Sequence, residues 1–177
     1  VMVQEWFLRA ANAAGAPPTY NALRKLRVLK GIPLPAFDAQ TTRLRIRIEP
    51  VAKDPAALNV TLYDAAGVAR FAAQVVQQPP SSAETIRKII ETSAAWPHAA
   101  VAGADLYGSQ LFHGPAFATL QQVDRLGEYG ARADLIGSQH VGWDAPRPSP
   151  LAAPTLATWF TDPALIDGGL QLARVWG

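Results

Sequence analysis

The order of sequence patterns along this 177-residue chain predicts an α+β fold. Apolar residues recur at helical spacing near the N-terminus, alternating strand-like segments follow, and an apolar helix comes last. The order of helix, strands, linker, strands and helix indicates an internal duplication, because each half then has one helix and one set of strands. We therefore expect a first half at 1–78, a linker with a short helix at 79–104, and a second half at 105–177.

The first half is expected to begin with a helix and to continue with strands. Apolar residues lie at helical spacing before Gly15, which is placed to end the helix: Val3, Trp6, Phe7, Ala10 and Ala14. The segment 42–49 alternates strictly, so its aliphatic residues point inward and its three arginines share one exposed face. The segments 58–63 and 68–76 are predicted to form a hairpin, with Gly67 supplying a positive φ at the turn.

The linker is expected to contain the short helix. The run Pro79-Pro80-Ser81-Ser82 breaks the strand pattern. Ser81, with Glu84 three residues later, resembles a capping box, and the helix is expected to run through Ile86, Ile89 and Ile90.

The second half is predicted to contain a hairpin and a long loop before its helix. The strands of the hairpin are expected at 116–126 and 131–136, around Gly127 and Gly130. The Pro-rich stretch 145–154 is expected to be a loop.

The C-terminal helix carries the candidate catalytic acid. Asp162 is a good N-cap, and Pro163 suits the first helical position because its missing N–H would have no helical partner there. A helix that starts there places Asp167 and Gln171 on one face among apolar residues. Burial raises the pKa of a carboxyl group, so a buried Asp167 could hold a proton near neutral pH and donate it to a leaving group. The spacing leaves an alternative open, in which Asp167 lies on a solvated helix face with Gln171 as an ordinary polar neighbour.

Gly168 and Gly169, beside the candidate acid, are expected to mark a close approach. Each glycine inside a helix costs roughly 1 kcal/mol relative to alanine. A bound substrate or a tightly packed sheet would explain the missing side chains.

Composition excludes several classes of site. The formal net charge of +2 is too small to indicate a nucleic-acid or membrane surface, and no apolar run approaches the ~20 residues of a membrane span. The absence of cysteine excludes disulfides and thiolate metal ligands, and it fits a reducing cytoplasm. His98 and His140 are expected at the surface, and the three histidines lack the spacing of a zinc site. We find no phosphate loop, nucleophile elbow or dinucleotide fingerprint, so the residues predict no metal and no resident cofactor.

A second segment that carries a motif is Asp105-Leu106-Tyr107-Gly108-Ser109-Gln110-Leu111-Phe112-His113-Gly114-Pro115-Ala116-Phe117, where His-Gly-Pro breaks a strand-like run. Gly114 permits a backbone conformation that other residues avoid, and Pro115 fixes the next φ. LFHGPAF and DPALIDGGLQ together resemble the Tyr/His-Gly-Pro-x-Phe and Asp-Pro-x-x-x-Asp-x-x-x-Gln motifs of the dehydratase domain of type I polyketide synthases and polyunsaturated fatty-acid synthases. The N-terminal segments VMVQEWFLRAA and LRKLRVLKGIPL resemble the same family.

The resemblance implies a double hotdog fold, in which two long apolar helices are each wrapped by a curved antiparallel sheet. It also implies a catalytic dyad made of a histidine from one half and an aspartate from the other. The family's histidine precedes the first helix in a His-x-x-x-Gly-x-x-x-x-Pro motif, and no residue of this sequence matches it. We therefore expect the chain to be truncated at both ends, without the first strand and histidine motif of the first half and without the last strands of the second.

The implied reaction is the removal of water from a carrier-bound 3-hydroxyacyl thioester, which gives the enoyl thioester. By resemblance, Asp167 would protonate the departing hydroxyl, Gln171 would hold Asp167, and the unmatched histidine would take the α-proton. His113 is expected to support Asp167 or the loop rather than to act as the base. The expected substrate-binding residues are Tyr107, His113, Gly114, Pro115 and Phe117.

The resemblance further implies that an acyl carrier protein delivers the substrate on its phosphopantetheine arm, within a multidomain synthase of the cytoplasm. Neighbouring synthase domains and a homodimer partner are also expected. The arginine row at 42–49 could receive an acidic carrier protein, although a charged row on a strand is more often a solvated face. Two other functions stay open: a noncatalytic hotdog domain that binds or shapes an acyl chain, and an isomerase or thioesterase on the same scaffold.

Overall fold

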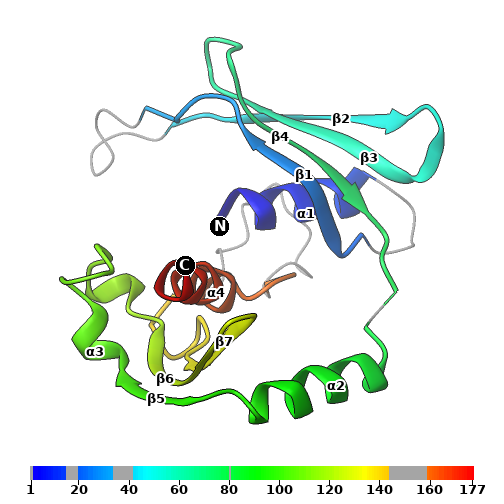
Figure 1. The fold of residues 1–177 in the computed structure, drawn as a ribbon. Coiled ribbons are helices and arrows are strands. Elements are labelled where there is room, and N and C mark those ends of the chain that lie inside the picture. The colour runs from blue at the N-terminus through cyan, green and yellow to red at the C-terminus, as the bar shows by residue number, and fades with distance from the viewer. Residues whose placement is uncertain (1, 15–19, 34–41, 80, 144–158) are drawn as a thin grey trace. The chain divides into compact units, whose positions relative to one another are not determined.

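The computed structural model describes residues 2–14, 20–33, 42–79, 81–143 and 159–177. The chain forms two compact units, Met2–Pro79 and Pro80–Gly177. The described residues contain four α-helices and two antiparallel sheets, of four and three strands (Figure 1). The predicted α+β class is therefore confirmed, whereas the assignment of the two units to hotdog halves stays a prediction.

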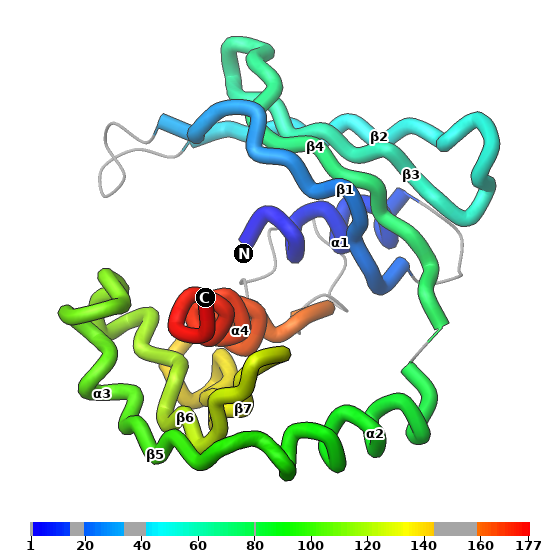
Figure 2. The backbone as a smooth tube through the Cα atoms, viewed as in Figure 1, coloured from blue at the N-terminus to red at the C-terminus, as the bar shows by residue number. Residues whose placement is uncertain are grey.

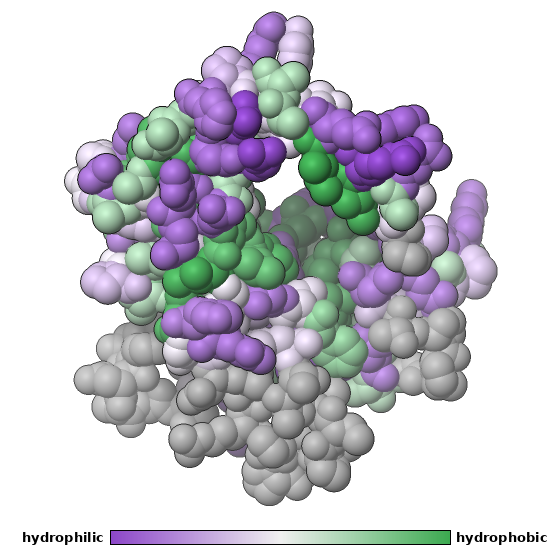
Figure 3. Space-filling model, turned by 90° about the horizontal axis from the view of Figure 1, so that it is seen from below, coloured by the Kyte–Doolittle hydropathy of each residue, from purple (hydrophilic) through white to green (hydrophobic). Residues whose placement is uncertain are grey.

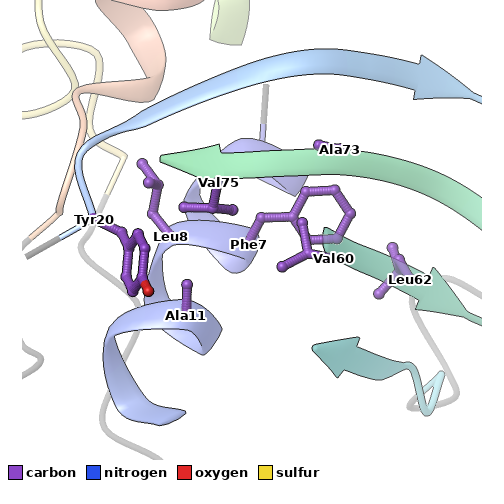
Figure 4. Close-up of a cluster of buried hydrophobic side chains, with 8 residues drawn as sticks. All are labelled: Phe7, Leu8, Ala11, Tyr20, Val60, Leu62, Ala73 and Val75. Atoms are coloured by element: carbon purple, nitrogen blue, oxygen red, sulfur yellow. The ribbon is translucent and has the colours of Figure 1, made fainter. Parts of the chain in front are cut away.

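The unit Met2–Pro79 packs one helix against one face of its sheet. Figure 4 shows Phe7 and Leu8 of the helix among side chains of the strands. The buried cluster comprises Phe7, Leu8, Ala11, Tyr20, Val60, Leu62, Ala73 and Val75. Neighbouring strands pair antiparallel in the order β1-β4-β3-β2. The elements of this unit are α1 (Met2–Ala14), β1 (Ala22–Val28), β2 (Arg45–Val51), β3 (Asp54–Tyr63) and β4 (Ala69–Val76).

The sequence patterns predict the helix and three of the four strands of this first unit, but they do not predict β1. The N-terminal helix is confirmed, and so is the hairpin between β3 and β4, where Gly67 has the expected positive φ of 78°. Asp64 fixes the turn, because its carboxylate accepts a hydrogen bond from the N–H of Val68 at 2.8 Å. The alternation of β2 is also confirmed, since its arginines are exposed and its isoleucines are partly buried.

The unit Pro80–Gly177 contains a three-stranded sheet in the order β5-β6-β7. Its last helix, α4, lies against β6 and β7 (Figure 2). Its buried apolar cluster is Leu106, Leu111, Leu120 and Val123. The elements of this unit are α2 (Ala83–Ala94), β5 (His98–Ala102), α3 (Gly103–Leu106), a 3-10 turn (Pro115–Phe117), β6 (Leu120–Gly127), β7 (Gly130–Leu135) and α4 (Pro163–Trp176).

The hairpin predicted around Gly127 and Gly130 is confirmed as β6 and β7. The predicted start of its first strand at 116 is wrong, because Pro115–Phe117 is a 3-10 turn and β6 begins at Leu120. A Cβ atom added to Gly127 or Gly130 would lie 2.7 Å or 2.5 Å from a ring atom of Trp96. The two glycines therefore let the Trp96 indole lie directly against the hairpin.

Several expectations need correction. The predicted linker, 79–104, contains more than a helix, because β5 lies within it and pairs with β6. The prediction of long helices is wrong for the described residues: α1 has 13 residues and α4 has 14, close to the average of about 11–12 in globular proteins. The Pro-rich stretch 145–154 and Gly15 lie outside the described residues.

Apolar side chains of α2 lie at the surface. Ile86, Ile89 and Ile90 are about half exposed, and they share one helix face because they are spaced by three and four residues. Figure 3 shows hydrophobic side chains at the surface among hydrophilic ones. No helix among the described residues is long and apolar enough to cross a membrane.

The N-cap of α2 is Ser82 and not Ser81. The Ser82 hydroxyl accepts a hydrogen bond from the N–H of Thr85 at 3.1 Å, so the predicted capping box of Ser81 with Glu84 is wrong: the third residue after the observed cap is Thr85, and Glu84 forms an ion pair with Lys88 instead. Both serines precede the same apolar pattern, and sequence spacing alone does not separate them.

Ser82→Ala should therefore loosen α2. The variant loses the acceptor for an N–H of the first turn, which costs about 1 kcal/mol in local stability. Ser81→Ala is the matched control and should change that stability by less than about 0.5 kcal/mol. Amide hydrogen exchange along α2 measures both, and equal protection in the two variants would contradict the assignment of the cap.

Candidate functional site

The start of α4 is anchored by Asp162. Its carboxylate accepts hydrogen bonds from the N–H groups of Ala164 at 3.0 Å and Leu165 at 3.1 Å, as predicted for the N-cap. It also accepts hydrogen bonds from the N–H and hydroxyl of Ser138, which follows β7. Burial alone would raise the pKa of Asp162, but the hydrogen bonds from Ser138 and the backbone hold this pKa below its ordinary value. An ionised Asp162 thus fixes the beginning of α4 to the chain after β7.

The side chain of Gln171 is the centre of a buried polar network. It is 1% exposed, and its Nε2 donates to Asp167 Oδ2 at 2.7 Å and to the carbonyl of Phe117 at 2.8 Å. Its Oε1 accepts a hydrogen bond from the Tyr107 hydroxyl at 2.7 Å. That hydroxyl in turn accepts one from the N–H of Leu120 at 2.8 Å. The segment that contains the His-Gly-Pro sequence and the C-terminal helix therefore meet at this amide.

The hydrogen bonds of the network run in one direction, from the N–H of Leu120 to Asp167. The carbonyl of Phe117 can only accept, so it fixes the NH2 side of the Gln171 amide toward Phe117 and Asp167. Asp167 Oδ2 is then an acceptor, and a proton on Asp167 would have to be on Oδ1. Among the described residues none donates a hydrogen bond to Oδ1, which leaves this oxygen available to a ligand.

Tyr107 has to be protonated to donate its hydrogen bond to Gln171. Burial raises the pKa of Tyr107 above its ordinary value. The hydroxyl is therefore neutral near pH 7. Its single proton is used on Gln171, so Tyr107 positions that amide, and the expected contact of Tyr107 with substrate stays a prediction.

The predicted burial of Asp167 is found only in part. The buried face of α4 contains Ala164, Gly168 and Gln171, which are spaced as one face of a helix. Asp167 lies beside this face and is partly exposed. The predicted burial of the carboxyl group is therefore wrong in its full form. The alternative, a solvated Asp167 beside an ordinary polar Gln171, is corrected for Gln171, because that amide is buried and donates to Asp167.

The two glycines of α4 have different surroundings. A Cβ atom on Gly168 would lie 2.9 Å from Thr119 Oγ1 and 3.0 Å from Leu135 Cδ2. A Cβ atom on Gly169 would meet no atom of the described residues within 4 Å. The expected close approach is thus confirmed at Gly168, where the partners are Leu135 of β7 and Thr119 directly before β6. At Gly169 no described residue packs closely enough to explain the missing side chain, and a close approach by substrate there stays a prediction.

The His-Gly-Pro segment forms a turn that presents a carbonyl to Gln171. Pro115–Phe117 is a 3-10 turn, and the N–H of Phe117 donates to the carbonyl of Gly114 at 2.9 Å. Gly114 has φ −74° and ψ 173°, an extended conformation open to any residue, so the special backbone predicted for it is wrong. The Phe117 ring packs edge-on against Trp143 with 5.0 Å between ring centroids.

His113 lies next to this turn and stacks on Phe112. The ring centroids are 4.3 Å apart, and Phe112 is 91% exposed. The Nδ1 atom of His113 is buried and has no hydrogen-bond partner among the described residues. No hydrogen bond links His113 to Asp167 in this part of the chain, so the expected support of Asp167 by His113 stays a prediction.

The other histidines lie apart from the network. His98 is in β5 and His140 is in the turn that precedes Trp143, and both are exposed, as predicted. In the described ranges, no group of three or more His, Asp or Glu side chains is arranged to hold a metal ion.

Sequence reasoning missed two buried hydroxyl residues, Thr119 and Ser138. Thr119 contacts the glycine side of α4, and Ser138 holds Asp162. Both are fully buried. A single Ser or Thr beside a strand has no spacing pattern that marks it, so only the packing of α4 on the sheet identifies these residues.

The pair of glycines allows a matched test of the packing of α4. Gly168→Ala should destabilise the chain by about 1–2 kcal/mol, because the added methyl group overpacks the contact with Thr119 and Leu135. Gly169→Ala should stabilise it by up to about 1 kcal/mol through helix propensity. Urea unfolding of both variants measures the difference, and a gain of stability in Gly168→Ala would contradict the close contact.

Tyr107→Phe tests the network itself. The variant leaves the Gln171 oxygen and the N–H of Leu120 without partners, which should lower the free energy of unfolding by about 1–3 kcal/mol at pH 7. Tyr129→Phe is the control, since Tyr129 is 79% exposed, and it should change stability by less than about 0.5 kcal/mol. Equal stability of the two variants would show that the hydroxyl of Tyr107 has no structural role.

The same variant tests the direction of the pKa shift of Tyr107. Tyr107 has a higher pKa in the folded state than in the unfolded state, where it is about 10. Its contribution to the free energy of unfolding is therefore complete below about pH 10 and is lost as the pH rises through the folded-state pKa. The stability difference between the unmodified chain and Tyr107→Phe should therefore be constant from pH 7 to about 9 and shrink above about pH 10. A difference that grows at alkaline pH in urea unfolding would reverse the assignment.

Comparison with known proteins gives no match: no family model, curated protein or solved structure matches the chain. The interpretation of the site therefore depends on its motifs and its geometry.

Proposed function

We propose that this chain is the dehydratase region of a multidomain polyketide or fatty-acid synthase and acts on a carrier-bound 3-hydroxyacyl thioester. The observation that carries the proposal is the chain of hydrogen bonds from Tyr107 through Gln171 to Asp167. The two segments that resemble the dehydratase motifs lie more than fifty residues apart in sequence. The hydrogen bonds connect both segments to the carboxyl group of Asp167.

In the proposed dehydration, the carboxyl group of Asp167 acts as the general acid. Hydroxide is a poor leaving group at neutral pH, so the β-oxygen has to be protonated while a base removes the α-proton. Asp167 Oδ1 gives its proton to the β-oxygen, the bond between that oxygen and the β-carbon breaks, and the electron pair of the α-C–H bond forms the new double bond. The products are water and the α,β-enoyl thioester.

Gln171 has a defined role in this step. When Asp167 loses its proton it becomes a carboxylate, and the hydrogen bond from Gln171 Nε2 to Oδ2 becomes charge-assisted and stronger. Tyr107 and the carbonyl of Phe117 prevent the amide from rotating away. The network therefore stabilises the carboxylate that Asp167 becomes when it has donated its proton.

The base in the proposal is the family's histidine, which no residue of this sequence matches. His98 and His140 are exposed and lie apart from the network. We do not assign His113 as the base, because it occupies the Tyr/His position directly before Gly114-Pro115 in the motif, for which the resemblance implies support of Asp167 or of the loop.

Two further features support the proposal. Each unit packs one helix on an antiparallel sheet, α1 on β1–β4 and α4 on β6 and β7, as a double hotdog requires, although neither helix is long. Phe117 and Trp143 form an aromatic pair next to the carbonyl that holds Gln171, and such rings offer an apolar surface to an acyl chain.

Asp167→Asn should abolish most of the turnover of the full-length protein. The amide keeps the shape of the side chain and can still accept from Gln171, but it cannot donate an acidic proton, so enoyl formation from a 3-hydroxyacyl pantetheine thioester should fall by at least about a hundredfold. Chromatographic assay of the enoyl product measures the rate, and circular dichroism checks the fold.

Asp134→Asn is the matched control, because it removes an exposed carboxylate from β7 of the same unit, and it should retain full activity. Undiminished turnover by Asp167→Asn would refute the role of the acid. Release of free 3-hydroxy acid would indicate a thioesterase, and the absence of any product from the unmodified full-length protein would favour a noncatalytic acyl-binding domain.

A further inference from the structure

Four arginines lie on the face of the four-stranded sheet opposite α1. Figure 1 shows α1 on one side of this sheet, and the inward residues of the strands form the buried cluster with it. On the other side, strand register aligns side chains in rows across the sheet. We call this surface the outer arginine face, and its cations are Arg24, Arg27, Arg45 and Arg47.

One of these rows has an arginine at both edges of the sheet. In this row, Arg27 of β1 pairs with Ala72, Ala72 pairs with Thr61, and Thr61 pairs with Arg47 of β2. The two central residues of this row, Ala72 and Thr61, have small side chains.

A β-bulge in β1 brings two of the arginines to the same face. Arg24 and Arg27 are three residues apart, and regular alternation would place them on opposite faces. The register shifts between them, and Lys25 adopts a positive φ of 57°, a conformation that is strained for a residue other than glycine. The bulge therefore adds a cation to the outer arginine face.

Two of these cations have no counter-ion among the described residues. Arg47 pairs with Glu49 at 2.7 Å, and Arg24 pairs with Asp54. By contrast, neither Arg27 nor Arg45 forms an ion pair with any described residue, and both are exposed. The face thus has two free guanidinium groups that suit carboxylates, which they can bind in a bidentate way.

Charge is distributed unequally along the chain. Residues 2–79 contain ten Lys and Arg against five Asp and Glu, a formal charge of +5, whereas residues 80–177 contain six against nine, a formal charge of −3. The net charge of +2 for the whole chain hides this difference. An acidic partner would therefore be steered to the first unit and away from the unit that contains Asp167.

We propose that the outer arginine face is the docking surface for an acidic protein, and that its occupant is the carrier that presents the thioester. The identity of the occupant rests on the proposed function, whereas the docking of an acidic surface does not. Glu49 and Asp54 on the same face weaken binding to a continuous phosphate backbone. They also provide partners for single basic residues of a folded protein, so the pattern favours a protein over a nucleic acid.

Binding of a purified acidic acyl carrier protein to the full-length protein tests the proposal. The double variant Arg27→Gln/Arg45→Gln should weaken binding at low salt by about tenfold and reduce its salt dependence. Lys30→Gln/Lys53→Gln removes the same charge from the same unit at positions outside the rows, and it should bind nearly as tightly as the unmodified protein. Fluorescence anisotropy with a labelled carrier protein measures the dissociation constants.

A kinetic experiment compares the 3-hydroxyacyl thioester bound to the carrier protein with the same thioester on free pantetheine. The arginine variant should raise KM for the carrier-bound 3-hydroxyacyl substrate and leave kcat and KM for the free pantetheine thioester unchanged. Three results would overturn the proposal. The arginine variant could bind the carrier as tightly as the unmodified protein, or the lysine variant could lose as much carrier affinity as the arginine variant. The third is that the arginines prove necessary for binding a short RNA while the carrier does not bind. Arginine-dependent carrier binding without enoyl formation would refute the dehydratase function and leave the docking surface standing.

Discussion

The candidate site depends on the buried amide of Gln171 having all of its hydrogen-bonding groups satisfied. An amide buried without partners is costly, because each unsatisfied polar group loses its hydration without compensation. Gln171 avoids this cost by donating to Asp167 and to the carbonyl of Phe117 and by accepting from Tyr107. Since these partners come from different segments, the burial of one side chain aligns the C-terminal helix with the turn and the sheet.

The packing of α4 makes this alignment possible. Asp162 fixes the start of the helix by accepting hydrogen bonds from its first turn and from Ser138. Six residues further along the chain, Gly168 lets the helix approach Thr119 and Leu135 closely. With the helix held at both points, Gln171 is buried and Asp167 lies beside it, partly exposed and held by the hydrogen bond from Gln171 to Oδ2.

Local patterns predicted the elements of the fold better than the surroundings of the site. The cap at Asp162 and the hairpin turn at Gly67 follow from backbone chemistry within a few residues, so they could be predicted from sequence. The depth of Asp167, the open surroundings of Gly169 and the ordinary backbone of Gly114 depend on how distant segments pack, which no local spacing encodes.

The direction of the hydrogen bonds assigns separate tasks to the two oxygens of Asp167. Oδ2 accepts from Gln171, so in the proposed reaction Oδ1 is the oxygen that meets the substrate. The most direct test is an experimental structure of the full-length protein with a 3-hydroxyacyl pantetheine amide. We predict that its β-hydroxyl lies at hydrogen-bond distance, about 2.7 Å, from Asp167 Oδ1 while Gln171 remains on Oδ2. A bound analogue whose β-hydroxyl makes no contact with Asp167, or a Gln171 amide turned away from this carboxyl, would contradict the account.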